Sequence, residues 1–197
     1  MQIGKERLNI LIQETNGLLR EGEILAVAGF AGLSDTLSYL QEKPCLLTKR
    51  FSRTFLRESL CVCQESFLTA ASFLKRIKEE SLFPGYGSIS MERDGFLPAL
   101  WKLAEASRVG LCVDLGKVPV RQETIEICEA LELNPYTLPS AEALIIGLPT
   151  KGGEYWQDSV NSGLLTPIGI VTSGPERSLY CQGRKRYLER PALLWQE

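Results

Sequence analysis

The sequence predicts an α/β fold in which helices pack on a mixed β-sheet. Helical and strand-like patterns interleave along its 197 residues, which is typical of layered α/β domains. Residues 143–148 (ALIIGL) are apolar without a break, as expected of a central strand that is buried on both faces. Residues 95–120 have the pattern of a helix, a tight turn, a strand and an exit before proline.

The first part of the chain is predicted to begin with a helix and a buried strand. Residues 5–19 carry leucine and isoleucine at helical spacing, with a weak point at Asn16-Gly17. The apolar run 23–29 lies between glycines and predicts a short buried strand. We expect the next helix to begin at Ser34 or Asp35, because either side chain can accept hydrogen bonds from free backbone N–H groups.

Pro44 is expected to separate that helix from two further amphipathic helices, at 46–60 and 66–78. The first of these combines apolar side chains with a basic stripe. We expect the stripe to be a solvated face, and an anion or nucleic-acid patch is the alternative. The stripe consists of Lys49, Arg50, Arg53 and Arg57.

The second part of the chain alternates strands and helices. The predicted helices are residues 95–107, residues 122–131 and a weaker one at 153–162. The predicted strands are residues 88–90, 111–114, 143–148 and 168–172, with a hairpin formed by 178–181 and 185–188.

Composition and charge exclude several classes of function. The formal net charge is -2 and the pI is about 5.5, which gives no drive towards nucleic acid or an anionic membrane. No apolar run approaches the ~20 residues that span a bilayer, and no signal peptide is evident, so we expect a cytoplasmic protein. The chain has no histidine, which excludes Ser-His-Asp and Cys-His catalysis and imidazole metal ligands.

Six cysteines are present, and only Cys61 and Cys63 are close in sequence. Structural zinc sites use pairs spaced by about two to four residues, and such pairs are absent from the sequence. We therefore expect reduced thiols that are buried as small apolar side chains, and no metal. A redox or metal role for Cys61 and Cys63 is the alternative.

The first candidate site is the turn that contains Gly29 and Gly32, between a predicted strand and a predicted helix. The free N-terminus of a helix attracts anions, so a small anionic ligand could bind there. The alternative is a tight turn without a ligand, because the segment has no lysine and few glycines compared with a phosphate-binding loop.

The second candidate site precedes the helix predicted at 95–107. Glu92 and Asp94 could bind a magnesium ion, which favours one or two carboxylates plus phosphate oxygens. Alternatively, Asp94 caps the helix. Arg93 would be a phosphate contact or a surface residue, and Gly95 completes the segment.

Several short motifs occur in an order and spacing that point to a known family. They are Gly22-Glu23-Ile24, AEASRVG at 104–110, Asp114, VPV at 118–120, residues 123–131, Asn134-Pro135 and residues 143–146. Together they resemble the C-terminal domain of the aminoimidazole ribonucleotide synthetase-related family. Within that family, the hydrogenase-maturation carbamoyl dehydratase resembles the chain most.

This resemblance implies a two-domain pattern in which an N-terminal domain carries most ATP-handling acids and mediates dimerisation. It implies here a helical segment (1–20) before a C-terminal-type domain (21–197), without the ATP-binding domain. The family's histidine–aspartate pair would fall at Ile89-Ser90, its double glycine at Asp94-Gly95 and a further glycine at Glu142. These departures remove anion contacts, so ATP chemistry by the chain alone is not expected.

We therefore expect a non-catalytic binding or scaffold protein, linked to hydrogenase or metallocentre maturation, with no cofactor. One alternative is a component of an ATP-dependent enzyme, using ATP-Mg and completed by a separate N-terminal-type domain. Another is a regulator that binds a small ligand at the turn containing Gly29 and Gly32.

The expected partner is a second copy of the chain or another protein, with no nucleic acid and no membrane. A homodimer would have Leu8 and Leu11 near the contact, because the surface covered by a neighbouring domain in the family should stay partly apolar here. The same N-terminal segment could instead cover that surface within its own chain.

Overall fold

The computed structural model of the chain describes residues 5–80, 85–150 and 154–192. Its strands are β1 (Ile24–Ala28), β2 (Ser88–Met91), β3 (Gly110–Asp114), β4 (Ser140–Leu148), β5 (Leu165–Thr172), β6 (Arg177–Cys181) and β7 (Arg184–Tyr187). They form one seven-stranded sheet in the order β2-β4-β1-β5-β3-β6-β7. Neighbouring strands are antiparallel except β3 and β6, which are parallel. The α/β fold with a mixed sheet predicted from the sequence is confirmed.

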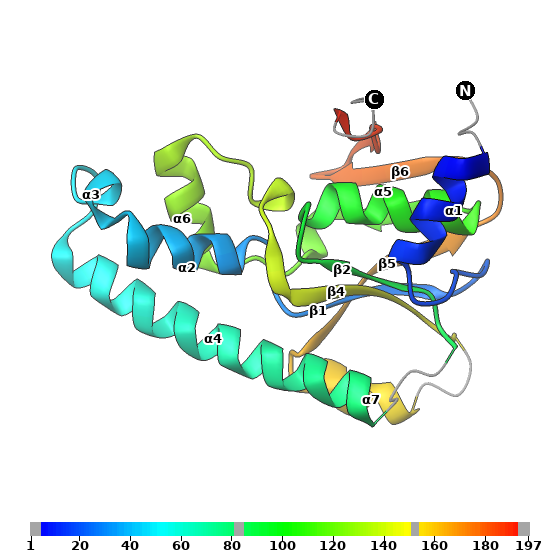
Figure 1. Cartoon of the computed structure of the whole chain (residues 1–197), viewed down its shortest axis with the longest axis horizontal. Helices are drawn as coiled ribbons and strands as arrows, with labels where there is room; N and C mark the ends of the chain where they lie inside the picture. The colour runs from blue at the N-terminus through cyan, green and yellow to red at the C-terminus, as the bar shows by residue number, and fades with distance from the viewer. Residues whose placement is uncertain (1–4, 81–84, 151–153, 193–197) are drawn as a thin grey trace.

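Helices lie on both faces of this sheet (Figure 1). They are α1 (Lys5–Glu14), α2 (Leu33–Glu42), α3 (Pro44–Leu47), α4 (Arg53–Glu79), α5 (Phe96–Ser107), α6 (Gln122–Leu131) and α7 (Glu154–Asn161). Two short 3-10 turns are η1 (Leu115–Lys117) and η2 (Pro135–Thr137). Helices α1 and α5 cover one face, whereas the C-terminal half of α4 and α7 cover part of the other.

The largest part of the core lies between α5 and the sheet. Phe96, Leu100 and Leu103 are fully buried and follow one another at helical spacing, so one stripe of α5 faces the strands. Each such side chain contributes about 1.5–3 kcal/mol on burial. These contacts hold α5 in place on the sheet, so the positions of side chains at both ends of the helix are well defined.

Strand β4 is buried on both faces, as the apolar run predicts, but it is second from the edge of the sheet and not its central strand. It lies between β2 and β1. Ile145 packs in the core on the α5 side, and Ile146 packs on the side of α4 and α7. The strand begins three residues before the apolar run, at Ser140, because the preceding segment also pairs with β2.

Helix α1 covers α5 within the same chain. Leu11 is 3% exposed and joins the core beside α5, as does Leu19 after the helix. The expected place of Leu11 in a contact between two copies is therefore wrong, because its side chain is already used inside the chain. Leu8 is half-buried. The homodimer itself and the domain boundary after residue 20 stay predictions.

Helix α4 is one continuous helix where the sequence analysis expected two, at 46–60 and 66–78. Residues 53–79 contain no glycine or proline, so nothing ends the helix between the two apolar stretches. The Ser52 hydroxyl caps its start by accepting from the Phe55 backbone N–H at 3.2 Å. Within the described part of the chain, no helix, α4 included, is long and apolar enough to cross a membrane.

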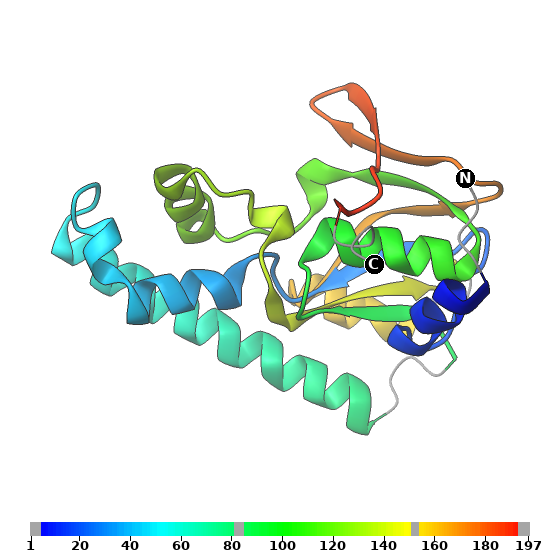
Figure 2. The same cartoon turned by 45° about the horizontal axis from the view of Figure 1, so that its top comes forward.

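The N-terminal half of α4 extends beyond the sheet and forms a helical lobe with α2, α3 and α6 (Figure 2). Leu33, Leu37 and Leu47 are buried in this lobe with Cys63 and Ile127. The residues of the basic stripe are exposed on its surface. The lobe therefore has its own small core beside the main one.

The N-cap residue of α2 is Gly32, and the expected caps Ser34 and Asp35 lie inside the first turn of the helix. Ser34 is used for a tertiary contact instead. Its hydroxyl donates to the Pro139 carbonyl at 2.9 Å and accepts from the Ala141 N–H at 3.0 Å. Tertiary packing therefore overrides the local capping preference here.

One half of the sheet has a face that no described helix covers. Helices α4 and α7 pack on β4, β1 and β5, and leave the outer face of β3, β6 and β7 open. Pairing register places Cys112, Asp114, Ile170 and Tyr180 together on this face. They line a shallow hollow of about 640 Å³.

Candidate functional site

The predicted segment before α5 forms a small hollow of about 200 Å³ between α1, β2 and α5. Glu92, Arg93 and Asp94 line it together with Glu14 and Lys102. Glu92 and Arg93 are exposed, and Asp94 is half-buried. The structure thus brings these predicted residues together at the N-terminal end of α5.

Asp94 does not cap α5, so that alternative is wrong. The cap residue is Gly95, and no side chain bonds to the free N–H groups of the first turn. The Asp94 carboxylate instead accepts from Lys102 Nζ at 2.5 Å. Glu14 of α1 accepts from the same ammonium group at 2.8 Å. Lys102, eight residues after Asp94, is therefore the partner that sequence reasoning missed.

Lys102 is the centre of this ion triad. Its side chain is 11% exposed, and those of Asp94 and Glu14 are 22% and 34% exposed. Burial lowers the pKa of Lys102, but the hydrogen bonds that its ammonium group donates to Asp94 and Glu14 outweigh this effect, so the pKa is raised and the ammonium form is favoured. The triad ties α1 to α5 and compensates the charge of Asp94.

The predicted glycines Gly29, Gly32 and Gly95 all pack closely against one segment, residues 135–143. A Cβ at Gly95 would lie 2.6 Å from the Leu138 carbonyl oxygen, and one at Gly32 would lie 3.0 Å from that of Pro135. A Cβ at Gly29 would clash with the Glu142 carbonyl oxygen. All three glycines have positive φ. Their spacing in the sequence therefore reflects close backbone packing at the starts of α2 and α5.

The N-terminus of α2 is partly satisfied from within the chain. The Gly32 N–H donates to Ser140 Oγ at 2.7 Å, and the Ala31 N–H donates to the Pro119 carbonyl at 2.9 Å. Gly29 and Gly32 are themselves buried. The turn has the geometry of the alternative that the sequence left open, a tight strand-to-helix connection. Ligand binding at this turn stays a prediction.

Glu142, which stands where the resemblance places a glycine, is 1% exposed. Neither carboxylate oxygen has a hydrogen-bond partner among the described residues. Burial raises the pKa of Glu142 to about 7, although its own backbone N–H and, to a smaller extent, the nearby Ser34 hydroxyl favour the charged form. The buried carboxyl group of Glu142 is therefore mostly uncharged below about pH 7 and mostly ionised above it.

The cysteines differ in exposure. Burial raises the pKa of Cys63 to about 12 and that of Cys128 to about 11, so both thiols stay protonated near pH 7. Cys61 is exposed. Within the described residues, no three His, Cys, Asp or Glu side chains are grouped as metal ligands. The absence of a metal stays a prediction.

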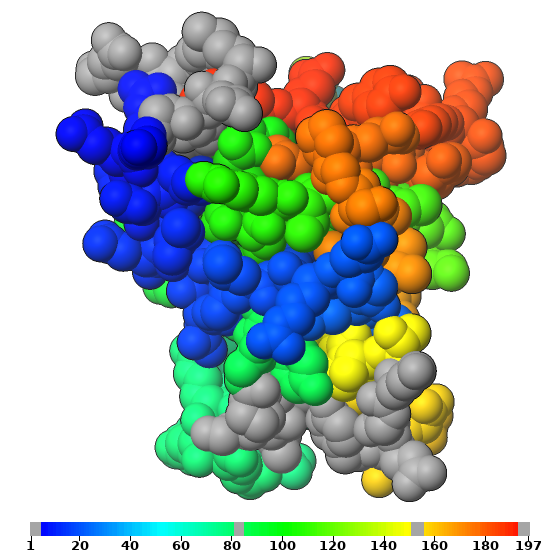
Figure 3. All heavy atoms as spheres, turned by 90° about the vertical axis from the view of Figure 1, so that its right-hand side faces the viewer, coloured from blue at the N-terminus to red at the C-terminus, as the bar shows by residue number. Residues whose placement is uncertain are grey.

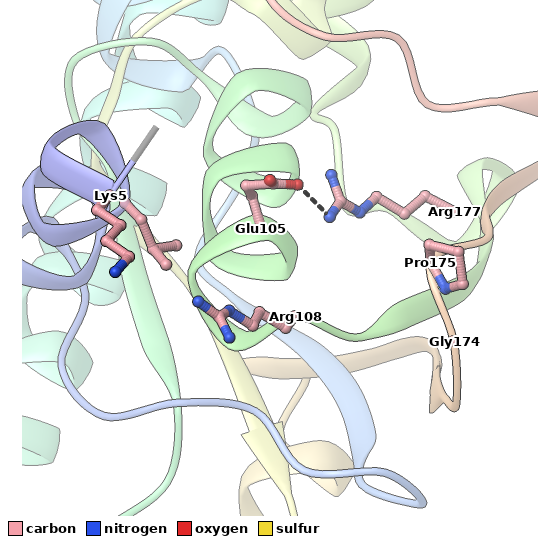
Figure 4. A pocket seen from close by; sticks show the side chains of 7 residues that line it. Lys5, Glu105, Arg108, Gly174, Pro175 and Arg177 are labelled. Carbon is pink, nitrogen blue, oxygen red and sulfur yellow. Dashed lines mark hydrogen bonds and ion pairs between the residues drawn. The ribbon is translucent and has the colours of Figure 1, made fainter. Parts of the chain in front are cut away.

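A larger hollow, of about 480 Å³, lies at the other end of α5 (Figure 4). Its walls are α1, the end of α5 and the turn between β5 and β6. Three cationic side chains, Lys5, Arg108 and Arg177, and one carboxylate, Glu105, line it. Sequence reasoning missed this site because its residues are far apart along the chain. In the sequence, Arg108 stands out only as a cation directly after the helix. It indicates a site only when the turn at Gly174 is known to lie beside it.

No protein-family model matches the chain, and no curated protein sequence matches it. Solved structures do share its fold. A hydrogenase maturation protein, HypE, aligns over 88% of this chain with a TM-score of 0.63 at 19% identity. HypE of E. coli aligns over 88% with a TM-score of 0.61 at 21% identity. Thiamine monophosphate kinase of Aquifex aeolicus aligns over 85% with a TM-score of 0.54 at 23% identity.

The chain spans about half the length of these proteins, since it covers 54%, 51% and 52% of their chains. HypE has also been solved with HypF and with ATP. At identities below 25% the likeness establishes the fold. The chain therefore has the fold of aminoimidazole ribonucleotide synthetase-related proteins, as the sequence motifs implied.

Proposed function

We propose that this protein is a non-catalytic binding or scaffold protein that holds a protein partner during hydrogenase or metallocentre maturation. Its fold is that of HypE, a hydrogenase maturation protein that also occurs in a complex with HypF. This likeness supports the link to maturation and a protein partner, and the surface of the chain supports the mode of binding.

The observation that carries the proposal is the open face of β3, β6 and β7. Ile170 is 42% exposed and Tyr180 is 36% exposed on this face. Tyr187 of β7 pairs with Ser178 on the same side and is 65% exposed. Apolar side chains gathered on an uncovered sheet face are typical of a protein contact site.

The charge beside this face specifies the chemistry of the partner. Strand β7 is the edge of the sheet and carries Arg184, Lys185 and Arg186, all exposed. A row of cations repels a second edge of the same kind, so pairing of two β7 strands is disfavoured. Register places Lys185 on the open face, where it pairs with Glu176, and places Arg184 and Arg186 on the other face of the same edge. The partner is therefore a different protein whose apolar patch covers the open face and whose acidic side chains reach around this edge.

The alternative, a component of an ATP-dependent enzyme, is favoured by the hollow before α5. Glu92 and Asp94 lie there within one cavity, as a magnesium site would need. Against it, Lys102 already binds Asp94 at 2.5 Å, and a metal ion would have to displace that ammonium group. This competition supports the non-catalytic function over the ATP-dependent alternative.

Photo-crosslinking from the open face tests the scaffold function. A photoreactive phenylalanine analogue replaces Tyr180 in the full chain, expressed in its native host. The matched control carries it at Leu68, an apolar residue of α4 that is 65% exposed. We expect position 180 to capture a hydrogenase or metallocentre maturation protein and position 68 not to capture it. Equal products from both positions, a dimer of the chain alone, or no product would contradict the proposal.

Calorimetry with ATP-Mg separates the two candidates. We expect no binding, because the charge of Asp94 is already compensated within the triad. A micromolar dissociation constant, equivalent to about -8 kcal/mol, would favour the ATP-dependent alternative instead.

A further inference from the structure

We propose that the hollow at the C-terminal end of α5 binds a small organic phosphate of the size of a sugar phosphate. This site is distinct from the open sheet face and goes beyond the proposed scaffold function. Figure 3 shows the end of the molecule where blue N-terminal residues, green residues from the middle of the chain and orange residues from the β5–β6 region meet.

The charge of the hollow favours an anion. Arg177 Nη2 donates to Glu105 Oε2 at 2.5 Å, so these two charges compensate each other. The side chains of Lys5 and Arg108 form no ion pair or hydrogen bond within the described residues. Figure 4 shows Arg108 directed towards the side of the hollow where Lys5 lies. A phosphate monoester carries nearly two negative charges near pH 7 and matches these two cations.

Arg177 is held in place before any ligand arrives. Its guanidinium stacks on the Trp101 ring at 5.2 Å from the centroid and is fixed at one end by Glu105. The side chain is 12% exposed, and its Nε has no acceptor among the described residues. The burial of Nε restricts this side chain further. The fixed fork also lowers the entropy lost on binding.

The wall formed by the β5–β6 turn is equally fixed. A Cβ at Gly110 would lie 2.6 Å from the Glu176 carbonyl oxygen and 3.1 Å from that of Gly174, so the turn packs directly on the start of β3. The Leu111 N–H also donates to the Glu176 carbonyl at 2.8 Å. This close packing sets the position of the wall relative to the start of β3.

The size and lining of the hollow favour an organic ligand over a bare ion. About 480 Å³ lies within the range of small-molecule sites and far exceeds one phosphate group. Leu8 and Pro175 add apolar surface beside the cations. A phosphate bound by the cations would therefore leave room for a sugar-sized body against these two side chains.

Isothermal calorimetry at pH 7.5 and low salt tests the site on the full chain. The probes are ribose 5-phosphate, glucose 6-phosphate, inorganic phosphate and, as the neutral control, ribose. We expect at least one sugar phosphate to bind more tightly than inorganic phosphate, and ribose not to bind. Raising the salt concentration should weaken binding.

Two variants locate the binding to the hollow. Arg108→Gly removes a cation where the backbone is left-handed, at φ 56, so the fold tolerates the change. Lys5→Gln removes the second cation. Each should weaken binding about tenfold or more, whereas Lys49→Gln, a matched change on the exposed basic stripe, should leave it unchanged.

The proposal is overturned if neither sugar phosphate binds at about 10 mM, a concentration that would still reveal weak ligands by stabilisation. It is equally overturned if ribose or inorganic phosphate binds as well as the esters, or if Lys49→Gln weakens binding as much as Arg108→Gly. The melting temperature of each variant shows whether a loss of binding reflects a loss of folding.

Discussion

The two ends of helix α5 carry similar charged side chains, but these side chains have different contacts. At its N-terminal end, Asp94 and Glu14 share the ammonium group of Lys102. At its C-terminal end, Glu105 engages Arg177, while Lys5 and Arg108 remain available. Acidic groups near the start and basic groups near the end both suit the helix dipole. The difference is that the first set is consumed in holding α1 to α5, and the second retains charge for a ligand.

Gly95→Ala should produce the largest change and tests how tightly the start of α5 is built. The new Cβ would lie 2.6 Å from the Leu138 carbonyl oxygen and would sit at φ 77. We expect a loss of about 3–4 kcal/mol of unfolding free energy, measured by urea titration. Gly22→Ala is the control, because φ is +84 there but nothing lies within 4 Å, so only about 1–2 kcal/mol should be lost. Equal losses would show that Gly95 does not pack tightly against residues 135–143.

Glu142 extends the comparison to a carboxylate that has no cation. Its pKa is raised from 4.5 to about 7 in the folded state, so the folded protein holds a proton that the unfolded chain releases. The protonated Glu142 side chain therefore stabilises the folded state by about 3 kcal/mol relative to the ionised one. This contribution is complete below about pH 4.5 and is lost as the pH rises to about 7.

Glu142→Gln should remove that pH dependence of the unfolding free energy and make the protein more stable than the wild type above pH 7. Urea titrations between pH 4.5 and 8 measure both effects. Glu21→Gln, at an exposed position, is the matched control and should keep the wild-type profile. Identical profiles for the wild type and Glu142→Gln would show that water reaches this carboxylate.

Lys102→Met should leave Asp94 and Glu14 near each other without their shared cation. We expect a loss of about 2 kcal/mol, less than for a fully buried pair because both carboxylates keep some exposure. The control Lys75→Met removes an exposed ion pair with Glu79 and should change stability by less than about 1 kcal/mol. A cost for Lys102→Met as small as that of the control would mean that the triad does not hold α1.

Arg108→Gly should have the smallest effect on stability. Relief of the left-handed backbone is offset by the loss of a cation at the helix end, so the net change should stay within about 1 kcal/mol. Glu132→Gly at the same position of α6 removes an acidic group from a helix end, so both effects should stabilise, together by about 1 kcal/mol. Thermal unfolding compares the two variants. A larger gain in stability for Arg108→Gly than for Glu132→Gly would contradict the expected role of charge at the helix ends.

The residues that sequence reasoning located best are those whose environment is set by local pattern. The run at 143–148 indicates a strand with both faces buried, and Ile145 and Ile146 do point to opposite cores. The family motifs likewise anticipate the fold that HypE shares. Local pattern failed where a side chain had two uses. Ser34 could cap α2 but bonds to Pro139 and Ala141, and Asp94 could cap α5 but binds Lys102.

By itself, the sequence determined the α/β class, most of the strands and helices, and the grouping of Glu92, Arg93 and Asp94 before α5. Hydrophobic periodicity and glycine placement are local signals, so they can be interpreted without knowing the fold. Only the tertiary structure decided that α1 covers α5, that Lys102 neutralises Asp94, and that Lys5, Arg108 and Arg177 meet in one hollow. These outcomes depend on contacts between residues far apart in the chain, and a linear pattern of residue types carries no record of which distant charges come together.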